Sequence, residues 1–418
     1  MPEQIVTTCC IAGGGPAGMM LGYMLARVGV KTVVLEKHED FLRDFRGDTI
    51  HPSTLEVMAE LGLLDDLLRL PHQKAYELAA IIADRRYRVA DFSQLPVHCP
   101  FIALMPQWDF LNLLAQQAAG FPGFDLHMRA EVVDLIQERG RVAGVRARTP
   151  EGTLEVRADL VIGADGRSSV VREAAGLTVQ RFGAPMDVLW FRLPHEAGDP
   201  QESMGVFGAG AILVLIDRGT HWQCGYVIPK GGFDALRQRG LPDLAARIGR
   251  LAPFAAQRAA AIASWDEIKL LTVAVDRLST WWRPGLLCIG DAAHAMSPIG
   301  GVGINLAIQD AVATANITAM KLRERRMADS DLKAVQQRRI WPAYVTQQMQ
   351  QLIQRRVVAQ VLGDEQAPQP ALPLRLLDSE RWLRRLPARI IGIGVRPEHV
   401  ASALLAEAQG RVAAMASS

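Results

Sequence analysis

The 418-residue sequence has few of the residues that cross-link or anchor a chain. Only five cysteines occur, at positions 9, 10, 99, 224 and 288, and no CxxC pair or metal-ligand spacing relates them. This excludes a disulfide framework or a metal site and predicts reduced thiols in a cytoplasmic protein. The 36 glycines and 23 prolines follow no strict period, which excludes collagen-like and low-complexity architectures.

An excess of charge of one sign is also lacking. The chain carries 46 Lys and Arg against 44 Asp and Glu, too balanced for a nucleic-acid-binding protein. The uncharged run at residues 205–216 is too short to span a bilayer, and the N-terminus lacks the basic region of a signal peptide. Residues 321–418 nevertheless hold 16 basic and 9 acidic residues, which permits peripheral contact with anionic lipid or an acidic partner. A solvated basic face is the simpler interpretation.

What is present predicts an α/β protein with two unlike sheets. Residues 5–12, 17–28 and 31–36 form a strand, a helix and a strand, the βαβ unit of a parallel sheet. The runs at 186–193, 203–215 and 222–228 instead predict an antiparallel sheet. The remaining predicted elements are a hairpin over 75–95, strands at 160–162, 268–275 and 286–289, and helices at 52–61, 108–119, 233–239, 241–250 and 304–322.

Two further predictions concern helices. The helix over 52–61 should have Ser53 or Thr54 as its N-cap. A long helical stretch over 332–362 should be started or kinked by Pro342. Its apolar side chains fall on one face and are Trp341, Val345, Met349, Leu352 and Ile353.

The first motif that carries chemistry lies between the first strand and its helix. Residues 13–18 read Gly-Gly-Gly-Pro-Ala-Gly and fit GxGxxG: Gly13 permits the tight turn, Gly15 lets a pyrophosphate approach the backbone, and Gly18 lets helix and strand pack closely. The helix N-terminus supplies N–H groups to a diphosphate. Glu36 ends the second strand, where its carboxylate can accept hydrogen bonds from an adenosine ribose. The order of these parts predicts dinucleotide binding.

Two more motifs follow predicted strands. Residues 165–172 read DGRSSVVR, and taken alone Asp165 could simply cap a helix. Residues 290–294 read GDAAH and lead into Pro298 and a glycine-rich turn, 300–303, before a helix. Free N–H groups at 301–304 and the helix N-terminus would suit the anionic N1/C2=O edge of a reduced flavin. Since no Lys or Arg occurs between residues 291 and 321, this helix end is the local source of positive potential.

The three motifs in this order resemble the class A FAD-dependent aromatic hydroxylases, the family of para-hydroxybenzoate hydroxylase and the ubiquinone-pathway hydroxylases. The resemblance spans residues 5 to about 320. It implies a Rossmann-like FAD-binding domain of the glutathione-reductase type, an inserted antiparallel-sheet substrate domain and a C-terminal helical segment. It also implies non-covalent FAD, with NAD(P)H as a transient co-substrate. The implied reaction is hydroxylation of an electron-rich ring by O₂ through a C4a-hydroperoxyflavin.

The resemblance implies roles for particular residues. The loop at Pro298, Gly301 and Gly303 should face the flavin, while the catalytic residue itself stays open. Asp165 and Arg172 belong to a motif linked to both FAD and NAD(P)H. Gln107 stands where relatives often carry Arg. The residues expected to bind the cofactor are Gly13, Gly15, Pro16, Ala17, Gly18, Glu36, Lys37, Arg46, Gln107, Asp165, Gly290, Asp291, Gly301, Val302, Gly303, Ile304 and Asn305.

The expected domains are discontinuous. Residues 1–75, 100–182 and 268–330 should bind FAD, 76–99 and 183–267 should form the substrate domain, and 331–418 a helical region. Gly208 and Gly210 are not followed by the third glycine of a GxGxxG motif, so no second dinucleotide-binding fold is expected. The substrate, the choice of NADH or NADPH, and a monomeric or homodimeric state stay open.

The proton-transfer group and two other functions also stay open. Candidate groups for proton transfer are His51, His72, His98, His221, Tyr226 and His294. Trp190 and Tyr226 are candidates for the roof of an aromatic pocket. A prenyl-chain or other FAD-dependent reductase of the same superfamily and a non-catalytic flavoprotein are the alternatives. A flavin-dependent halogenase fits poorly, because the sequence at 281–284, WWRP, lacks the spacing of that class.

Overall fold

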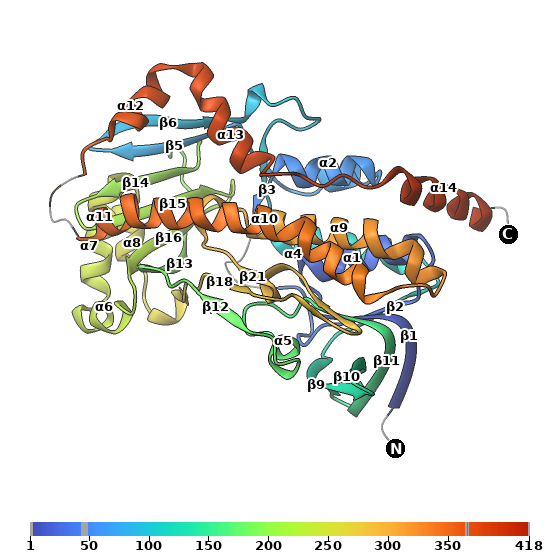
Figure 1. Ribbon diagram of the computed structural model, residues 1–418. Helices are drawn as coiled ribbons and strands as arrows, with labels where there is room; N and C mark the ends of the chain where they lie inside the picture. Colours follow the sequence, from blue (N-terminus) through green and yellow to red (C-terminus); the bar gives the residue numbers. More distant parts are fainter. Residues whose placement is uncertain (1–2, 43–48, 364–365, 367, 417–418) are drawn as a thin grey trace.

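The computed structural model describes residues 3–42, 49–363, 366 and 368–416. Its larger sheet has the order β19-β20-β11-β1-β2-β8, and β10 and β9 extend β11 on one side (Figure 1). The four central neighbours β20, β11, β1 and β2 run parallel. The apolar side chains of their central residues, 9–12, 33–35, 160–162 and 286–288, are buried, as expected for a sheet covered on both faces. The strands are β1 (Glu3–Ala12), β2 (Thr32–Leu35), β8 (Phe124–His127), β9 (Glu131–Glu138), β10 (Arg141–Thr149), β11 (Gly152–Gly163), β19 (Trp282–Arg283) and β20 (Leu286–Cys288).

The spatial order of the helices beside this sheet differs from their order in the sequence. Helix α1 (Pro16–Arg27) lies between α4 (Gln107–Ala119) and α9 (Gly303–Arg323). The short α2 (Pro52–Glu60) and α3 (Leu64–Arg69) follow each other, and α5 (Val170–Ala174) follows β11. The N-cap expected at Ser53 or Thr54 is wrong: His51 is the N-cap of α2, because Pro52 occupies the first helical position.

The second large sheet is the one predicted over the middle of the chain. Its order is β17-β13-β16-β15-β14-β5-β6, antiparallel except where β14 meets β5. The single strand predicted over 203–215 is two strands joined by a turn at residues 209–210, and that predicted over 268–275 keeps only three residues. The strands are β5 (Glu77–Ile82), β6 (Arg85–Asp91), β13 (Met186–Pro194), β14 (Met204–Gly208), β15 (Ala211–Asp217), β16 (His221–Pro229) and β17 (Lys269–Leu271).

The two faces of this sheet bury different sets of side chains. One face packs against α6 (Phe233–Arg239), α7 (Leu241–Leu251) and α8 (Ala256–Ala260) through a cluster that includes Phe191 and Trp222. The other face packs toward Ile299 and α11 (Ala359–Gly363). Strand β17 pairs with β13, so residues 269–271 join this sheet, although the sequence division assigned them to the FAD-binding part.

Two three-stranded sheets connect the large ones. In the order β3-β7-β4, strand β3 (Thr49–Ile50) and β4 (Gln73–Ala75) flank β7 (Ile102–Leu104). The other has the order β12-β18-β21 and joins the DGRSS region to the GDAAH turn. Its strands are β12 (Val179–Arg181), β18 (Asp276–Leu278) and β21 (His294–Ala295).

The C-terminal region differs from its prediction. Helix α10 runs unbroken over Asp329–Ile353 and passes through a π-helical turn, Gln354–Val358, into α11, so Pro342 lies inside the helix and does not start it. The expected apolar face does not turn inward: Trp341, Leu352 and Ile353 are exposed, whereas glutamines are buried. Helices α12 (Leu372–Ser379) and α13 (Arg385–Gly392) then cover β6, and α14 (Ser402–Ala416) packs on α9 (Figure 1).

Candidate cofactor and active site

The predicted motifs meet at one edge of the larger sheet. The glycine loop follows β1, Glu36 follows β2, Asp165 follows β11 and Gly290 follows β20. Because these four strands are parallel neighbours, their carboxyl ends lie side by side. This is the edge at which open α/β sheets bind ligands.

The glycine loop has the geometry that its sequence predicts. Gly13 has φ +105°, and a Cβ on Gly18 would strike the carbonyl oxygen of Gly13, so both positions require glycine. A Cβ on Gly15, by contrast, would meet nothing within 4 Å. The side of the loop at Gly15 therefore has room for a diphosphate.

Glu36 closes this loop from the neighbouring strand. Its Oε2 accepts the Gly14 N–H at 2.9 Å and its Oε1 accepts the His38 N–H at 3.1 Å. These contacts hold the carboxylate at the end of β2, where a ribose-binding acid is expected. Lys37, the next residue, is exposed.

The second motif is folded around its own carboxylate. Asp165 accepts the Ser169 hydroxyl and the Val171 N–H, and the Ser169 Oγ caps α5. Burial raises the pKa of Asp165 although these donors favour its charged form. In the described chain Asp165 therefore shapes the turn between β11 and α5, as a helix-capping role would require.

Two arginines join this motif to the GDAAH turn. Arg167 Nε donates to Asp291 Oδ2 at 2.9 Å. Arg172 donates to the Ala292 carbonyl at 3.4 Å and lies 3.5 Å from Asp276 Oδ1. The second and third motifs, more than a hundred residues apart, therefore form one structural unit.

The loop expected to face the flavin is held from the side by β3. The Thr49 hydroxyl donates to the Gly301 carbonyl at 3.0 Å, and a Cβ on Gly301, whose φ is +63°, would lie 2.5 Å from Thr49 Oγ1. Gly303 differs, because its nearest neighbour for a Cβ is Met296 at 4.0 Å. The open space therefore lies in front of Gly303, while Gly301 is a packing glycine. The Gly301 N–H donates to Pro298, so it is not the free donor that the sequence suggested.

Asn305 connects the loop to α2. Its Oδ1 accepts the His51 N–H at 2.9 Å and the Thr54 hydroxyl at 2.7 Å, and its Nδ2 lies 3.4 Å from the carbonyl oxygens of Thr49 and Gly301. Its side chain therefore fixes the start of α9. Val302 is the N-cap of α9, no side chain caps that helix, and Ile304 is buried.

Sequence reasoning missed the residues that support this loop from α10. Gln350 Nε2 donates to the carbonyl oxygens of Ser297 and Ile299, and its Oε1 accepts the Ser297 N–H. Gln347 donates to Asp276 and Ala295, and Gln354 to the Ser297 hydroxyl. We name Gln347, Gln350 and Gln354 the glutamine ladder. Their i, i+3, i+7 spacing was visible, but glutamine on a helix normally indicates a solvated face.

A buried ionic group lies beneath the GDAAH turn. Asp310 Oδ2 accepts the Gly290 N–H at 3.0 Å and contacts His294 Nε2 at 2.6 Å, and its Oδ1 accepts Arg339 Nε at 2.9 Å. Burial opposes the charge of Asp310, but His294 and Arg339 outweigh it and hold the pKa below its ordinary value. His294 therefore anchors the turn and is not poised toward a substrate.

The residues present fit a bound FAD. Arg167 Nη1 is buried without a hydrogen-bond partner among the described residues, beside Asp291 and at the same edge as the open Gly15. An unpartnered guanidinium nitrogen suits an anionic group. Pro16 and Ala17 begin α1, and the Cβ that Gly290 lacks would lie 3.1 Å from that of Ala17, so loop and turn meet closely. Gln107 is buried at the start of α4, and Arg46 lies outside the described residues.

The second sheet separates the two aromatic residues proposed for a pocket roof. Trp190 shares the cluster of Ile299 and Phe207, on the side of the glycine turn. Tyr226 shares the opposite face with α7, near Arg247. A common roof is therefore wrong, because residues on paired strands alternate between faces and these two have opposite parity.

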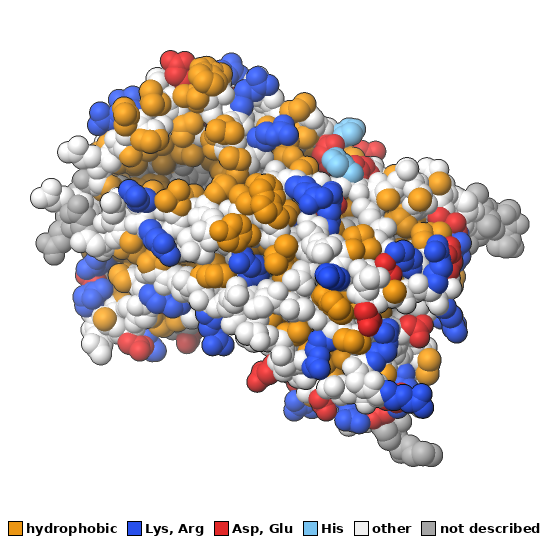
Figure 2. Space-filling model, in the orientation of Figure 1, with side chains coloured by type: hydrophobic (Ala, Val, Ile, Leu, Met, Phe, Trp, Pro, Cys, Tyr) orange, Lys and Arg blue, Asp and Glu red, His pale blue; other side chains and the backbone are white. Residues whose placement is uncertain are grey.

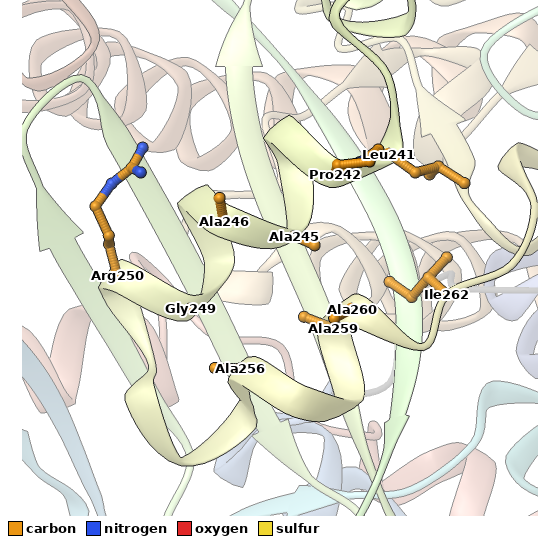
Figure 3. A pocket seen from close by; sticks show the side chains of 10 residues that line it. All are labelled: Leu241, Pro242, Ala245, Ala246, Gly249, Arg250, Ala256, Ala259, Ala260 and Ile262. Atoms are coloured by element: carbon orange, nitrogen blue, oxygen red, sulfur yellow. The ribbon is translucent and has the colours of Figure 1, made fainter.

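A groove of about 560 Å³ lies on the far face, between α7 and α8. Alanines make up half of its lining residues, and Arg250 lies at one end of the groove (Figure 3). It adjoins the helices that cover the Tyr226 face of the sheet, away from Ile299. The histidines proposed as bases are also scattered: His98 pairs with Glu56 at the surface, His72 contacts the Leu70 carbonyl, and the His221 side chain contacts Thr220.

A parallel dinucleotide sheet, a glycine turn facing open space and an apolar second sheet together define a two-lobed flavoprotein. A family model described as an FAD binding domain matches residues 6–349. The chain is 34% identical over 340 residues to 6-methylpretetramide 4-monooxygenase of Streptomyces rimosus, covering 80% of each chain. It is 26% identical over 322 residues to para-nitrophenol 4-monooxygenase of Pseudomonas sp. strain WBC-3, covering 72% of this chain and 75% of the relative.

A solved structure agrees in fold. That of p-nitrophenol 4-monooxygenase from Pseudomonas putida DLL-E4 superposes with a TM-score of 0.73 at 20% identity, covering 92% of this chain and 97% of the other. The chain belongs to the FAD-binding-domain family. It is an FAD-dependent monooxygenase of the aromatic-hydroxylase type, with NAD(P)H as electron donor. The described helices include none long and apolar enough to cross a membrane.

Proposed function

We propose that the enzyme hydroxylates an apolar aromatic compound in the space between Trp190 and the glycine turn at 298–303. The observation that carries this is the shared apolar cluster of Ile299, Trp190 and Phe207, in which the turn meets the second sheet. An aromatic ring stacked in such surroundings is held by apolar contact and shielded from water. The absence of Lys and Arg between residues 291 and 321 favours an uncharged substrate.

FAD, when bound, takes electrons from NAD(P)H and activates O₂. The chain holds it through the backbone of residues 13–18, Glu36, and the Arg167–Asp291 pair. Helix α9 begins at Gly303 without a side-chain cap. Its first N–H groups and the positive end of its dipole therefore face the open side of Gly303. The buried cluster against which Ile299 and Trp190 pack excludes water from one side and orients the ring.

Trp190 adds a polar contact to this pocket. Its Nε1 is buried without a hydrogen-bond partner in the described part of the chain. Such a group costs free energy unless a ligand satisfies it. We therefore assign it as a donor to a substrate oxygen, such as that of a phenol. The five free cysteines agree with a cytoplasmic location, which we include in the proposal.

The test is NAD(P)H and O₂ consumption by the purified holoenzyme across a panel of phenols, naphthols and their O-methyl ethers. An aromatic substrate should stimulate NAD(P)H oxidation and yield hydroxylated product. Trp190→Phe removes the N–H donor together with part of the ring, and it should raise KM for the phenol by roughly tenfold while kcat changes little. Phe207→Leu is the control for packing and should affect phenol and ether alike. No product with any aromatic compound, despite reducible FAD, would contradict the proposal.

A further inference from the structure

The exposed apolar side chains of the described chain are concentrated on the C-terminal helices. Nine of the fourteen large hydrophobic side chains that are exposed in the described chain fall between residues 341 and 386. Exposed apolar residues are usually scattered, so such a concentration indicates a contact surface. We name this set the apolar ridge: Trp341, Tyr344, Leu352, Ile353 and Val357 from α10 and the π-helical turn, with Leu372, Leu376, Trp382 and Leu386 from the α12–α13 segment.

The ridge has a structural cause. Helix α10 turns its glutamine ladder inward to hold residues 295–299, so its apolar side chains face outward. Helix α12 buries none of its residues. Figure 2 shows hydrophobic side chains over α10 and over the α12–α13 region, on both sides of a hollow. The ridge therefore lies on two elements that approach from opposite sides of one opening.

Cations surround the apolar ridge. Residues 351–396 contain eight arginines and four acidic residues. Of the acidic residues, Asp378 is engaged with Arg85 and with the Arg88 N–H. The exposed arginines beside the ridge are Arg355, Arg356, Arg375, Arg381, Arg385 and Arg389, which we name the basic rim.

We propose that the apolar ridge and its basic rim dock onto an anionic lipid bilayer. Apolar side chains with two tryptophans insert at the boundary between headgroups and acyl chains, and arginines pair with anionic headgroups. A symmetric contact between two copies would set basic rims against each other, which electrostatic repulsion disfavours. The charge of the rim thus selects an anionic surface over a second copy of this chain.

A short chain of hydrogen bonds connects the proposed docking surface to the cofactor loop. The Ile391 carbonyl, near the end of α13, accepts from His51 Nδ1 at 2.8 Å. The His51 N–H donates to Asn305, whose amide contacts Gly301. His51 therefore links α13, which would lie beside the bilayer, to the Asn305 side chain that fixes the turn. An apolar substrate dissolved in the bilayer would enter from this side.

The test is flotation of the FAD-loaded enzyme with vesicles, which requires no turnover and so stands apart from the substrate proposal. Vesicles of phosphatidylcholine mixed with an equal amount of phosphatidylglycerol should carry the enzyme upward. Vesicles of phosphatidylcholine alone should carry much less, and added salt should release it. Trp382→Ser with Leu386→Ser, and separately Arg355→Glu with Arg356→Glu, should each lower the bound fraction at least tenfold.

Matched variants lie elsewhere on the surface. Val133→Ser and Arg181→Glu replace an exposed apolar residue and an exposed arginine outside the ridge, and both should bind vesicles like the parent. All variants should keep FAD absorbance and thermal midpoint, because the replaced side chains are exposed. Binding that none of the ridge or rim variants alters, or no binding to anionic vesicles, would overturn the proposal. A concentration-dependent dimer that the ridge variants dissociate would assign the surface to a second copy instead.

Discussion

Individual residues at the cofactor edge differ in what constrains them. Gly301 is constrained by the fold, because its φ is positive and Thr49 occupies the position of a side chain. Gly303 has room on the side where a cofactor is expected. Substitutions at these two glycines therefore test different properties: Gly301 the stability of the loop, and Gly303 its contact with the cofactor.

We predict opposite outcomes for these two glycines. Gly301→Ala should destabilise the protein by about 1–3 kcal/mol, because the new methyl group must displace Thr49. Gly303→Val should fold with a nearly unchanged thermal midpoint but keep the flavin away from the helix end. It should therefore slow NAD(P)H-dependent reduction and release more H₂O₂, with a shifted flavin potential. Unchanged potential and coupling in Gly303→Val would place the ring elsewhere.

His51 gives the protein a pH dependence of known sign. Burial lowers the pKa of His51 from 6.5 to about 4, and its Nε2 has no described partner that could accept a proton. The unfolded chain binds this proton more readily, so stability is complete above pH 6.5 and is lost as the pH falls toward 4. Chemical denaturation should lose about 2 kcal/mol of unfolding free energy from this group between pH 7 and pH 5.

The matched variant for this prediction is His51→Gln, which keeps an N–H donor for Ile391 but does not titrate. Its stability should be lower at pH 7, yet it should fall less between pH 7 and pH 5 than that of the parent. Equal pH slopes in parent and variant would show that His51 is not the titrating group.

At the scale of elements, α10 does more than cover the sheet. Its glutamine ladder donates to the backbone carbonyls of Asp276, Ala295, Ser297 and Ile299. Buried polar groups of this kind specify one arrangement, because each unpaired carbonyl would cost free energy. The order of the cofactor turn therefore depends on a helix outside the motifs.

We predict that Gln350→Ala lowers stability by about 1–3 kcal/mol, since two carbonyls and one N–H lose their partner. The same change should weaken FAD retention in dialysis against buffer. Gln348→Ala, at an exposed position two residues earlier on the same helix, should change stability by less than about 0.5 kcal/mol. If both variants retained FAD equally, the ladder would have no part in positioning the turn.

At the scale of the whole molecule, the apolar cores are separate. One cluster includes the parallel sheet with α1 and α9, and another lies between the second sheet and α6–α8. The connections between them run through the Ile299 cluster and the small sheets. FAD bound at the edge of the first core should stabilise that core directly.

We predict that FAD raises the thermal midpoint through mass action. An excess of one hundredfold over Kd should contribute about 2.7 kcal/mol. Glu36→Ala should weaken FAD binding by about 1–3 kcal/mol and so lower this gain, because a ribose loses a charge-assisted hydrogen bond. Glu39→Ala, an exposed neighbour, is the control and should keep the full shift. Equal FAD-dependent shifts in Glu36→Ala and the parent would remove Glu36 from the site.

The sequence alone determined the parts that depend on backbone shape. Gly13, Gly18 and Glu36 have roles that follow from steric limits and strand order, and the structure places them at one edge. The same holds for the parallel strands and the helix after Gly303, because apolar runs and glycines are local signals. The family, FAD and the class of reaction followed from these motifs and were confirmed by the comparisons.

Only the tertiary structure decided which side chains meet. The Arg167–Asp291 pair joins residues distant in sequence, and the strand register sets Trp190 and Tyr226 on opposite faces. Helix α10 turned its glutamines inward because the backbone at 295–299 needs partners there, and its apolar residues were left outside. Amphipathic periodicity predicts that a helix has two faces, but the polarity of the surface it meets decides which face is buried.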